Sequence, residues 1–269
     1  MSSETASSET ESFETASSVT ARIAVVTGAN KGIGREIARQ LAELGLVVYL
    51  GARDEERGRA AESALRADGL DVRFLHLDVT DEKSVALAAQ RLAEEAGLLH
   101  VLVNNAGVGG PMQPPSETPT DQVRAVYETN VFGVITVTNA LLPLLRRAPS
   151  ARIVNVSSAI GSLSAAAANV DPTGVHPPGE FPVMLSYATS KTALNAVTLT
   201  YANELRGTGI LVNAASPGFV ATDINGHHGV LTTEQGAHIP VRLATLGDDG
   251  PTATFLGEDG TPEGQALQW

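Results

Sequence analysis

A tyrosine and a lysine stand four residues apart, Tyr187 and Lys191, in a segment with a helical pattern. Positions i and i+4 of a helix project from one face on adjacent turns, so the phenol and the ammonium should lie close together. At about 5 Å and an effective dielectric of about 20, the lysine charge favours the phenolate by about 3 kcal/mol, or about two pKa units. The spacing therefore predicts a proton-transferring pair. Taken alone, it also fits an ordinary structural pair.

A glycine-containing turn, Thr27-Gly28-Ala29-Asn30-Lys31-Gly32-Ile33-Gly34, lies between an apolar run and a helical pattern. Glycines there permit positive φ and a close approach of the backbone. The N–H groups of such a turn and of the following helix N-terminus attract phosphate. The context predicts a dinucleotide site rather than an ordinary tight turn.

Short apolar runs and longer helical patterns alternate from residue 22 onward. The runs are continuous rather than alternating in apolar character, which is typical of strands buried on both faces of a parallel sheet. This alternation predicts one doubly wound α/β domain with about seven parallel strands flanked by helices. We expect strands at 23–26, 46–50, 74–77, 101–103, 153–156 and 210–212, and helices at 33–44, 55–67, 81–96, 120–147 and 186–206.

Residues 1–20 differ in composition from the remainder. Seven Ser, four Thr and four Glu occupy fifteen of these twenty positions, and ETASS occurs twice. Such a segment buries too little apolar surface to offset its ordering entropy, so we expect a disordered tail. No Pro/Gly/Ser-rich linker divides the rest of the chain, and 21–269 is expected to be one domain.

Composition excludes several function classes. The 18 Lys and Arg against 30 Asp and Glu give a net charge of −12, which argues against nucleic acid and anionic membrane as partners. The absence of cysteine excludes disulfides and thiolate chemistry. No metal site is expected, since the adjacent pair His227 and His228 has no ligand at metal spacing and is interpreted as a solvated loop pair. We see no spanning stretch and no signal peptide, so the expected location is cytoplasmic.

Four motifs resemble those of the short-chain dehydrogenase/reductases, a family with a Rossmann fold. TGANKGIG is similar to their TGxxxGxG fingerprint, and Asn104-Asn105-Ala106-Gly107 is similar to their NNAG motif. The segment from Tyr187 through Lys191 is similar to YxxxK, and Ser216-Pro217-Gly218 is similar to PG. The resemblance covers the chain from about residue 22 to its last residue. The NKGIG spelling, an insertion before the tyrosine, the Asp248-Asp249-Gly250-Pro251 turn and the final Gln268-Trp269 resemble the carbonyl reductase branch.

The resemblance implies a catalytic tetrad of Asn130, Ser158, Tyr187 and Lys191. In it, the serine orients the substrate carbonyl, the tyrosine supplies the proton, the lysine also bonds the nicotinamide ribose, and the asparagine main chain holds a water. The main risk of misassignment is Ser157, directly before Ser158.

The implied cofactor is NADP(H). A carboxylate at the end of the second strand usually binds the ribose of NAD, whereas a cation accommodates the 2′-phosphate of NADP. Here Ala52 stands at the acidic position and Arg53 follows, with Lys31 as a second cation and Asp54 as a possible partial neutraliser of Arg53. The expected cofactor contacts are Gly28, Asn30, Lys31, Gly32, Ile33, Gly34, Arg53, Asp78, Val79, Asn105, Ala106, Gly107, Tyr187, Lys191, Pro217, Gly218, Val220 and Thr222.

Two segments should form the substrate pocket: an insertion loop at about 160–185 and a lid at about 219–240. The residues expected to line it are mostly small or apolar, which favours a ketone or aldehyde of moderate apolarity as the small-molecule partner. The assembly state stays open between monomer and homo-oligomer.

The leading hypothesis is NADPH-dependent reduction of a ketone or aldehyde, with Tyr187 as proton donor. The first alternative is an NADP-dependent alcohol dehydrogenase that works oxidatively with the same residues. A non-catalytic dinucleotide-sensing protein is another. A third alternative is an interaction protein that acts through the acidic tail.

Overall fold

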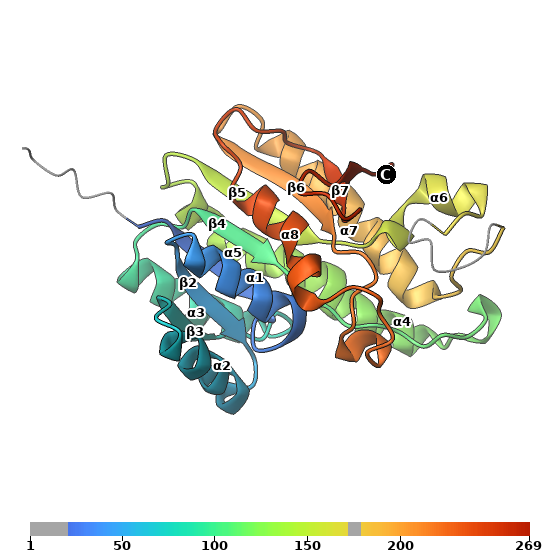
Figure 1. Cartoon of the computed structure of the whole chain (residues 1–269), viewed down its shortest axis with the longest axis horizontal. Helices are drawn as coiled ribbons and strands as arrows, with labels where there is room; N and C mark the ends of the chain where they lie inside the picture. The colour runs from blue at the N-terminus through green and yellow to red at the C-terminus, as the bar shows by residue number, and fades with distance from the viewer. Residues whose placement is uncertain (1–20, 172–178) are drawn as a thin grey trace, which may run out of the picture.

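The computed structural model describes residues 21–171 and 179–269. The expected tail and the centre of the expected insertion loop lie outside these residues. One sheet runs through the molecule in the order β3-β2-β1-β4-β5-β6-β7-β8 (Figure 1). The first seven strands pair in parallel, and β8 pairs antiparallel with β7. The strands are β1 Ile23–Thr27, β2 Val47–Ala52, β3 Val72–His76, β4 Val101–Asn104, β5 Ala151–Val156, β6 Ile210–Ser216, β7 Phe255–Gly257 and β8 Gln265–Ala266.

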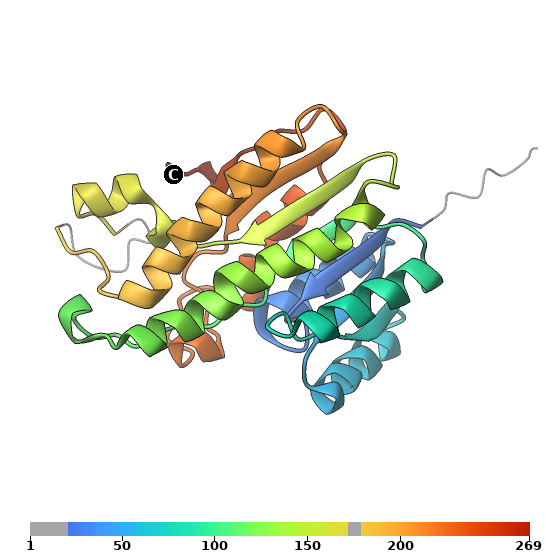
Figure 2. The same cartoon turned by 180° about the vertical axis from the view of Figure 1, so that it is seen from behind.

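Helices cover both faces of the sheet, as the sequence predicted (Figures 1 and 2). One core contains side chains of α1, α2 and α8, and the other contains side chains of α3, α5 and α7. The helices are α1 Gly32–Glu43, α2 Glu55–Ala67, α3 Glu82–Glu95, α4 Thr120–Tyr127, α5 Gly133–Leu145, α6 Leu163–Ala168, α7 Leu185–Glu204 and α8 Thr233–Ala244.

Strand β1 shows why the apolar runs are continuous. Ala24 and Val26 face the core under α1, and Val25 between them faces the core under α3 and α5. Successive side chains of a strand point to opposite faces, so a strand covered on both sides needs apolar residues throughout. The chain leaves β1 toward β2 and later returns to β4 on its other side. Ligands bind at such a switch point, beyond the carboxyl ends of the strands.

The expected helix at 120–147 is interrupted. After α4, residues Glu128–Phe132 form a π-helical turn before α5 begins. Pi turns are rare, and they concentrate at functional sites. The stretch 120–145 is also long and apolar enough to cross a membrane by length and composition, which the sequence analysis did not anticipate. In the molecule, 56% of its apolar window is buried, and it packs as a core helix against α3 and α7.

Three local features differ from the sequence pattern. Leu44, at the end of the apolar spacing of α1, is 60% exposed because the helix ends at Glu43 and the chain turns through Gly45. Helix α6 lies within the expected insertion loop, and α8 begins inside the expected lid. Helix α6 has only six residues, and α8 contains Gly236 and Pro240, which argue against a helix in the sequence.

Candidate active site

The glycine turn and the end of β4 are joined by hydrogen bonds at the switch point. The Thr27 hydroxyl accepts the backbone N–H groups of Asn105, at 3.0 Å, and Ala106, at 2.9 Å. The Asn105 side chain donates back to the Thr27 carbonyl at 2.8 Å. These contacts hold the glycine turn and the Asn-Asn-Ala-Gly motif in one fixed relationship.

Glycine is required at two positions of the site, Gly28 and Gly34. Gly28 has φ +64° and lies so close to β4 that a Cβ would stand 2.9 Å from the Ala106 Cα. A Cβ on Gly34 would stand 2.3 Å from the amide nitrogen of Asn105. At Gly107, a Cβ would occupy space 3.4 Å from the Asn130 oxygen and 3.7 Å from the Lys191 ammonium. At Gly28 and Gly34, the missing side chains let the glycine turn lie directly against the loop after β4.

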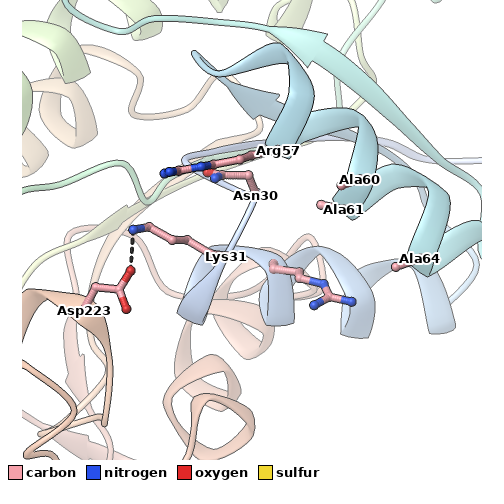
Figure 3. Close-up of a pocket in the computed structure, with 8 residues that line it drawn as sticks. Asn30, Lys31, Arg57, Ala60, Ala61, Ala64 and Asp223 are labelled. Carbon is pink, nitrogen blue, oxygen red and sulfur yellow. Dashed lines mark hydrogen bonds and ion pairs between the residues drawn. The ribbon is translucent and has the colours of Figure 1, made fainter.

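A cavity of about 460 Å³ adjoins the glycine turn (Figure 3). Its lining is basic, because Lys31, Arg35 and Arg57 all contribute to it, and Asp223 is the acidic member. Three cations beside a helix N-terminus fit a phosphate-bearing ligand. The remaining lining residues are Asn30, Ala60, Ala61 and Ala64.

Arg57 and Arg35 were not among the expected cofactor contacts. Both lie in the first turns of helices that begin at the sheet's carboxyl edge, which was the signal available in the sequence. Arg53 is exposed and lies outside the group that lines the cavity, beside Asp78. Burial raises the pKa of Asp78, but hydrogen bonds from Thr80 and the charge of Arg53 bring it below its ordinary value.

Asp54 does not neutralise Arg53 in the way the sequence suggested. Its carboxylate caps α2 by accepting the Arg57 backbone N–H at 3.0 Å, and it pairs with the Arg57 guanidinium at 3.4 Å. Asp54 therefore orients the first turn of α2 and its cation.

The lid contacts the glycine turn. Lys31 forms an ion pair with Asp223, and the methyl group of Thr222 would lie 3.8 Å from a Cβ on Gly32. The lid loop is closed by a bridge between Val220 and Leu231, and Gly218 before it takes φ +78°. The expected contacts Pro217, Gly218, Val220 and Thr222 thus belong to one folded segment beside the turn.

Tyr187 and Lys191 occupy the first two turns of α7, as their spacing predicted. The Lys191 ammonium lies 5.7 Å from the centroid of the Tyr187 ring and donates a hydrogen bond to the Val156 carbonyl at 2.8 Å. The lysine side chain is almost fully buried. Ser158, two residues after that carbonyl, lies near the Tyr187 hydroxyl and lowers the pKa of the phenol.

The pKa shifts of this pair differ from the sequence estimate. Burial raises the pKa of the Tyr187 phenol, and the hydrogen bond with Ser158 lowers it only in part. Burial also lowers the pKa of Lys191 to about 8. Removal from water penalises both charged forms, and this outweighs the lysine charge that we expected to favour the phenolate. The phenol is therefore held in its protonated form.

Asn130 lies in the π-helical turn and is fully buried. Its side chain accepts the Val108 backbone N–H at 2.8 Å and donates to the Val108 carbonyl at 2.9 Å. It also donates to the Ser190 hydroxyl at 3.0 Å, which in turn donates to the Tyr187 carbonyl at 2.7 Å. Asn130 thus ties the loop after β4 to the first turn of α7.

The two serines that end β5 have separate roles. The Ser157 hydroxyl is buried and donates to the Asn195 side chain at 2.6 Å. The Ser158 hydroxyl is partly exposed, accepts the Ile160 N–H at 3.4 Å, and contacts Tyr187. Since Ser157 is committed to the helix behind it, Ser158 is the one that faces the site.

Comparisons with known proteins identify the family of the chain. The family model described as short chain dehydrogenase matches residues 22–170 and 177–229. The chain is 37% identical to a short-chain dehydrogenase, anuI, of Penicillium roqueforti, across 85% of this chain and 90% of that one. It is also 37% identical to NADPH carbonyl reductase 1 of Homo sapiens, across 88% and 96%.

A solved structure is similar as well. It is the NADPH-bound carbonyl reductase from chicken fatty liver, 27% identical, with a TM-score of 0.78 over 93% of this chain and 99% of that one. The likeness extends over nearly the whole of both chains, so it includes the sheet, both helical layers and the segments around the glycine turn.

Proposed function

The chain belongs to the short-chain dehydrogenase family, and from that premise we propose that it reduces a ketone or aldehyde with NADPH, using Tyr187 as proton donor. It is an NADP-dependent oxidoreductase of the carbonyl reductase type. The observation that carries the proposal is the meeting of Tyr187, Ser158 and Lys191, with the Lys191 ammonium beside Gly107 of the loop after β4.

The residues around the turn fit NADP(H). The glycine turn at the N-terminus of α1 suits the pyrophosphate of a dinucleotide, and Gly107 beside the Lys191 ammonium suits its nicotinamide half. The cations of the cavity suit its additional phosphate, and Arg57 joins Lys31 in that role. When bound, the cofactor supplies the hydride.

Tyr187 and Ser158 handle the carbonyl oxygen. The phenol donates its proton to this oxygen as negative charge develops there, which is general acid catalysis. The Ser158 hydroxyl donates a second hydrogen bond to the same oxygen and orients the carbonyl. The Ser158 side chain lies near enough to the Tyr187 hydroxyl to affect the pKa of the phenol, so one substrate oxygen can accept from both side chains.

Lys191 and Asn130 support the acid. The Lys191 charge stabilises the phenolate left after proton transfer, at a distance of one helical turn. Asn130 holds the loop that carries Gly107 against α7, so the cofactor side and the acid side of the site keep their spacing.

Burial raises the pKa of the Tyr187 phenol, which suits a proton donor. A reductase needs a protonated phenol to give up a proton, whereas alcohol oxidation needs a phenolate to accept one. The non-catalytic alternative is disfavoured because all four tetrad positions carry the family residue and pack together.

Exposed apolar side chains support an apolar substrate. Met112, Val183 and Ile224 are each at least half exposed, and they come from the loop after β4, the approach to α7 and the lid. Ile224 also packs on the loop after β4, since its side chain would lie 3.3 Å from a Cβ on Gly109. These segments surround the end of the site that Tyr187 faces, which suits an aldehyde or ketone of moderate apolarity.

Initial rates of NADPH and NADH oxidation with a panel of aldehydes, ketones and anionic carbonyl compounds test the proposal. We expect turnover with NADPH and apolar carbonyls, and Arg53→Asp should shift the preference toward NADH. Turnover confined to anionic substrates would overturn the substrate class. An unaltered NADPH/NADH ratio in Arg53→Asp would refute the role of Arg53.

A further inference from the structure

Helix α6, the first element of the insertion, has almost no packing of its own. It spans six residues, Leu163–Ala168, and none of them is buried. A helix this short is not stable in isolation, so contacts at its ends must hold it in place.

The N-terminal end of α6 is fixed by Ser162 and by Trp269. The Ser162 hydroxyl caps the helix by accepting the Ala165 N–H at 3.2 Å. The main-chain oxygen of Trp269 accepts the Ser164 N–H at 3.3 Å and the Ser164 hydroxyl at 3.1 Å. The Ser162 hydroxyl also donates to it, at 3.5 Å. One oxygen from a distant segment therefore receives three donors at the start of this helix.

Trp269 is itself anchored to the sheet. Its ring stacks on Phe255 of β7, with centroids 5.3 Å apart and planes inclined by 24°. Phe255 is buried, and its carbonyl accepts the Leu267 N–H at 2.8 Å beside the β7–β8 pair. Both views in Figures 1 and 2 place the end of the chain next to α6. The sheet, the Trp269 ring and the start of α6 thus form a continuous connection.

That connection reaches the catalytic serine within one turn. Ser158 leads into the 3-10 turn Ala159–Gly161, and Ser162 follows directly. The Gly161 carbonyl accepts the Thr192 hydroxyl at 2.9 Å, so this turn is held on α7 one residue beyond Lys191. The far end of α6 is tied across the insertion, because the Asn169 side chain donates to the Gly179 carbonyl.

We propose that Trp269 is a positioning residue for substrate binding: it holds α6 as the wall of the carbonyl pocket next to Ser158. This rests on the proposed function, because it assigns the insertion to the substrate. The side chains that α6 presents are one leucine, one serine and four alanines, a surface that suits a bulky apolar group. Loss of the ring stack should release α6 and leave the glycine turn unchanged, so substrate binding should suffer and cofactor binding should not.

Hydrogen exchange tests the positioning directly. We compare the full chain with Trp269→Ala, Trp269→Phe and the control Gln268→Ala, a neighbouring exposed position. Exchange of the amides in 162–170 should quicken about tenfold in Trp269→Ala. It should stay near wild type in Trp269→Phe, which keeps an aromatic ring on Phe255, and in Gln268→Ala. Unchanged exchange in Trp269→Ala would overturn the proposal.

Kinetics separate positioning from a general loss of stability. With 2-naphthaldehyde as bulky probe, Trp269→Ala should raise KM about tenfold with kcat within about twofold, because lost wall contacts weaken binding rather than chemistry. Propanal kinetics and the NADPH Kd should be unchanged. Ser164→Ala, which removes one donor and leaves the stack, should move KM in the same direction. Equal losses for both aldehydes would contradict the proposal, and so would a weakened NADPH complex. If the wild-type chain reduced neither aldehyde, the proposed function would fail, and the exchange result would still decide the role of Trp269.

Discussion

Lys31 of the glycine turn is ion-paired with Asp223 of the lid. Both side chains are more than half exposed, at 58% and 55%. The hydrogen bond from Lys31 holds the pKa of Asp223 below its ordinary value, and His227 also bonds this carboxylate, at 2.8 Å. A phosphate that binds Lys31 must therefore share or displace this carboxylate. An exposed pair is weak in water, so the competition is modest.

Asp223→Asn should tighten NADPH binding. Removing the competing carboxylate frees Lys31, and the worth of an exposed pair corresponds to about a two- to fivefold lower Kd. The Kd for NADH, which lacks the 2′-phosphate, should not change. Fluorescence titration with both cofactors measures this, with Glu234→Gln as an acidic control on the neighbouring helix. Equal tightening of both cofactors, or none, would exclude the competition.

Arg57→Ala should weaken NADPH binding about tenfold, in line with the loss of one charge-assisted contact to phosphate. NADH binding should stay the same. Arg59 is the matched control, because it lies on the same helix but pairs with Glu55 and sits over the Phe74 ring. Titration of both variants with both cofactors decides the assignment, which fails if Arg57→Ala and Arg59→Ala behave alike.

Ser158→Ala should impair catalysis, whereas Ser157→Ala should impair stability. Loss of the Ser158 donor to the carbonyl oxygen should reduce kcat by about 10²–10³. Loss of the Ser157 hydroxyl leaves the buried Asn195 oxygen without its donor, so it should cost about 1–2 kcal/mol of stability with little effect on kcat. Steady-state kinetics and urea unfolding measure the two effects. The reverse pattern would move the catalytic role to Ser157.

Lys191→Met should stabilise the fold at neutral pH. Burial lowers the folded-state pKa of Lys191 from 10.5 to about 8, so at pH 7 the chain holds a charge that the site disfavours. A pKa shift of this size means that the charged lysine destabilises the wild-type fold by about 3 kcal/mol. The variant also loses the hydrogen bond to the Val156 carbonyl, which stabilises the fold by about 1 kcal/mol. Lys191→Met should therefore raise the free energy of unfolding by about 2 kcal/mol.

The stability gained by Lys191→Met should fall as the pH rises. Between about pH 8 and 10.5, the unfolded wild-type chain binds the lysine proton and the folded chain does not, so wild-type stability rises with pH through this window. The advantage of Lys191→Met should therefore shrink from pH 8 upward and become a disadvantage of about 1 kcal/mol above about pH 10.5, where only the lost hydrogen bond to the Val156 carbonyl remains. A difference between the two proteins that does not change with pH would contradict the depressed pKa.

Much of the fold was predictable because its signals are local. Continuous apolar runs identified six of the eight strands, and the helix expected at 81–96 is present as α3, which Asp81 caps by accepting the Lys83 N–H. The short strands β7 and β8 and the helix α6 have few residues and depend on contacts distant in sequence, such as Trp269 on Phe255. No local pattern predicts those.

In the candidate site, too, local signals predicted some features, and contacts between distant segments determined the others. Helical spacing brought Tyr187 next to Lys191, and the motifs located the glycine turn. The estimate from charge separation omitted burial, which raises the pKa of Tyr187 and lowers that of Lys191. Arg57 was missed, because its place in the cavity depends on how the first turn of α2 meets α1.

Tyr187→Phe tests the central claim most directly. The variant keeps the ring and loses the proton donor, so kcat for aldehyde reduction should fall by about 10²–10⁴ while the NADPH Kd stays within about twofold. Tyr201→Phe is the control on the same helix, since its hydroxyl bonds Asn139, and it should retain wild-type turnover. If Tyr187→Phe reduced the aldehyde at a rate close to that of wild type, Tyr187 would not be the proton donor and the proposed mechanism would be wrong.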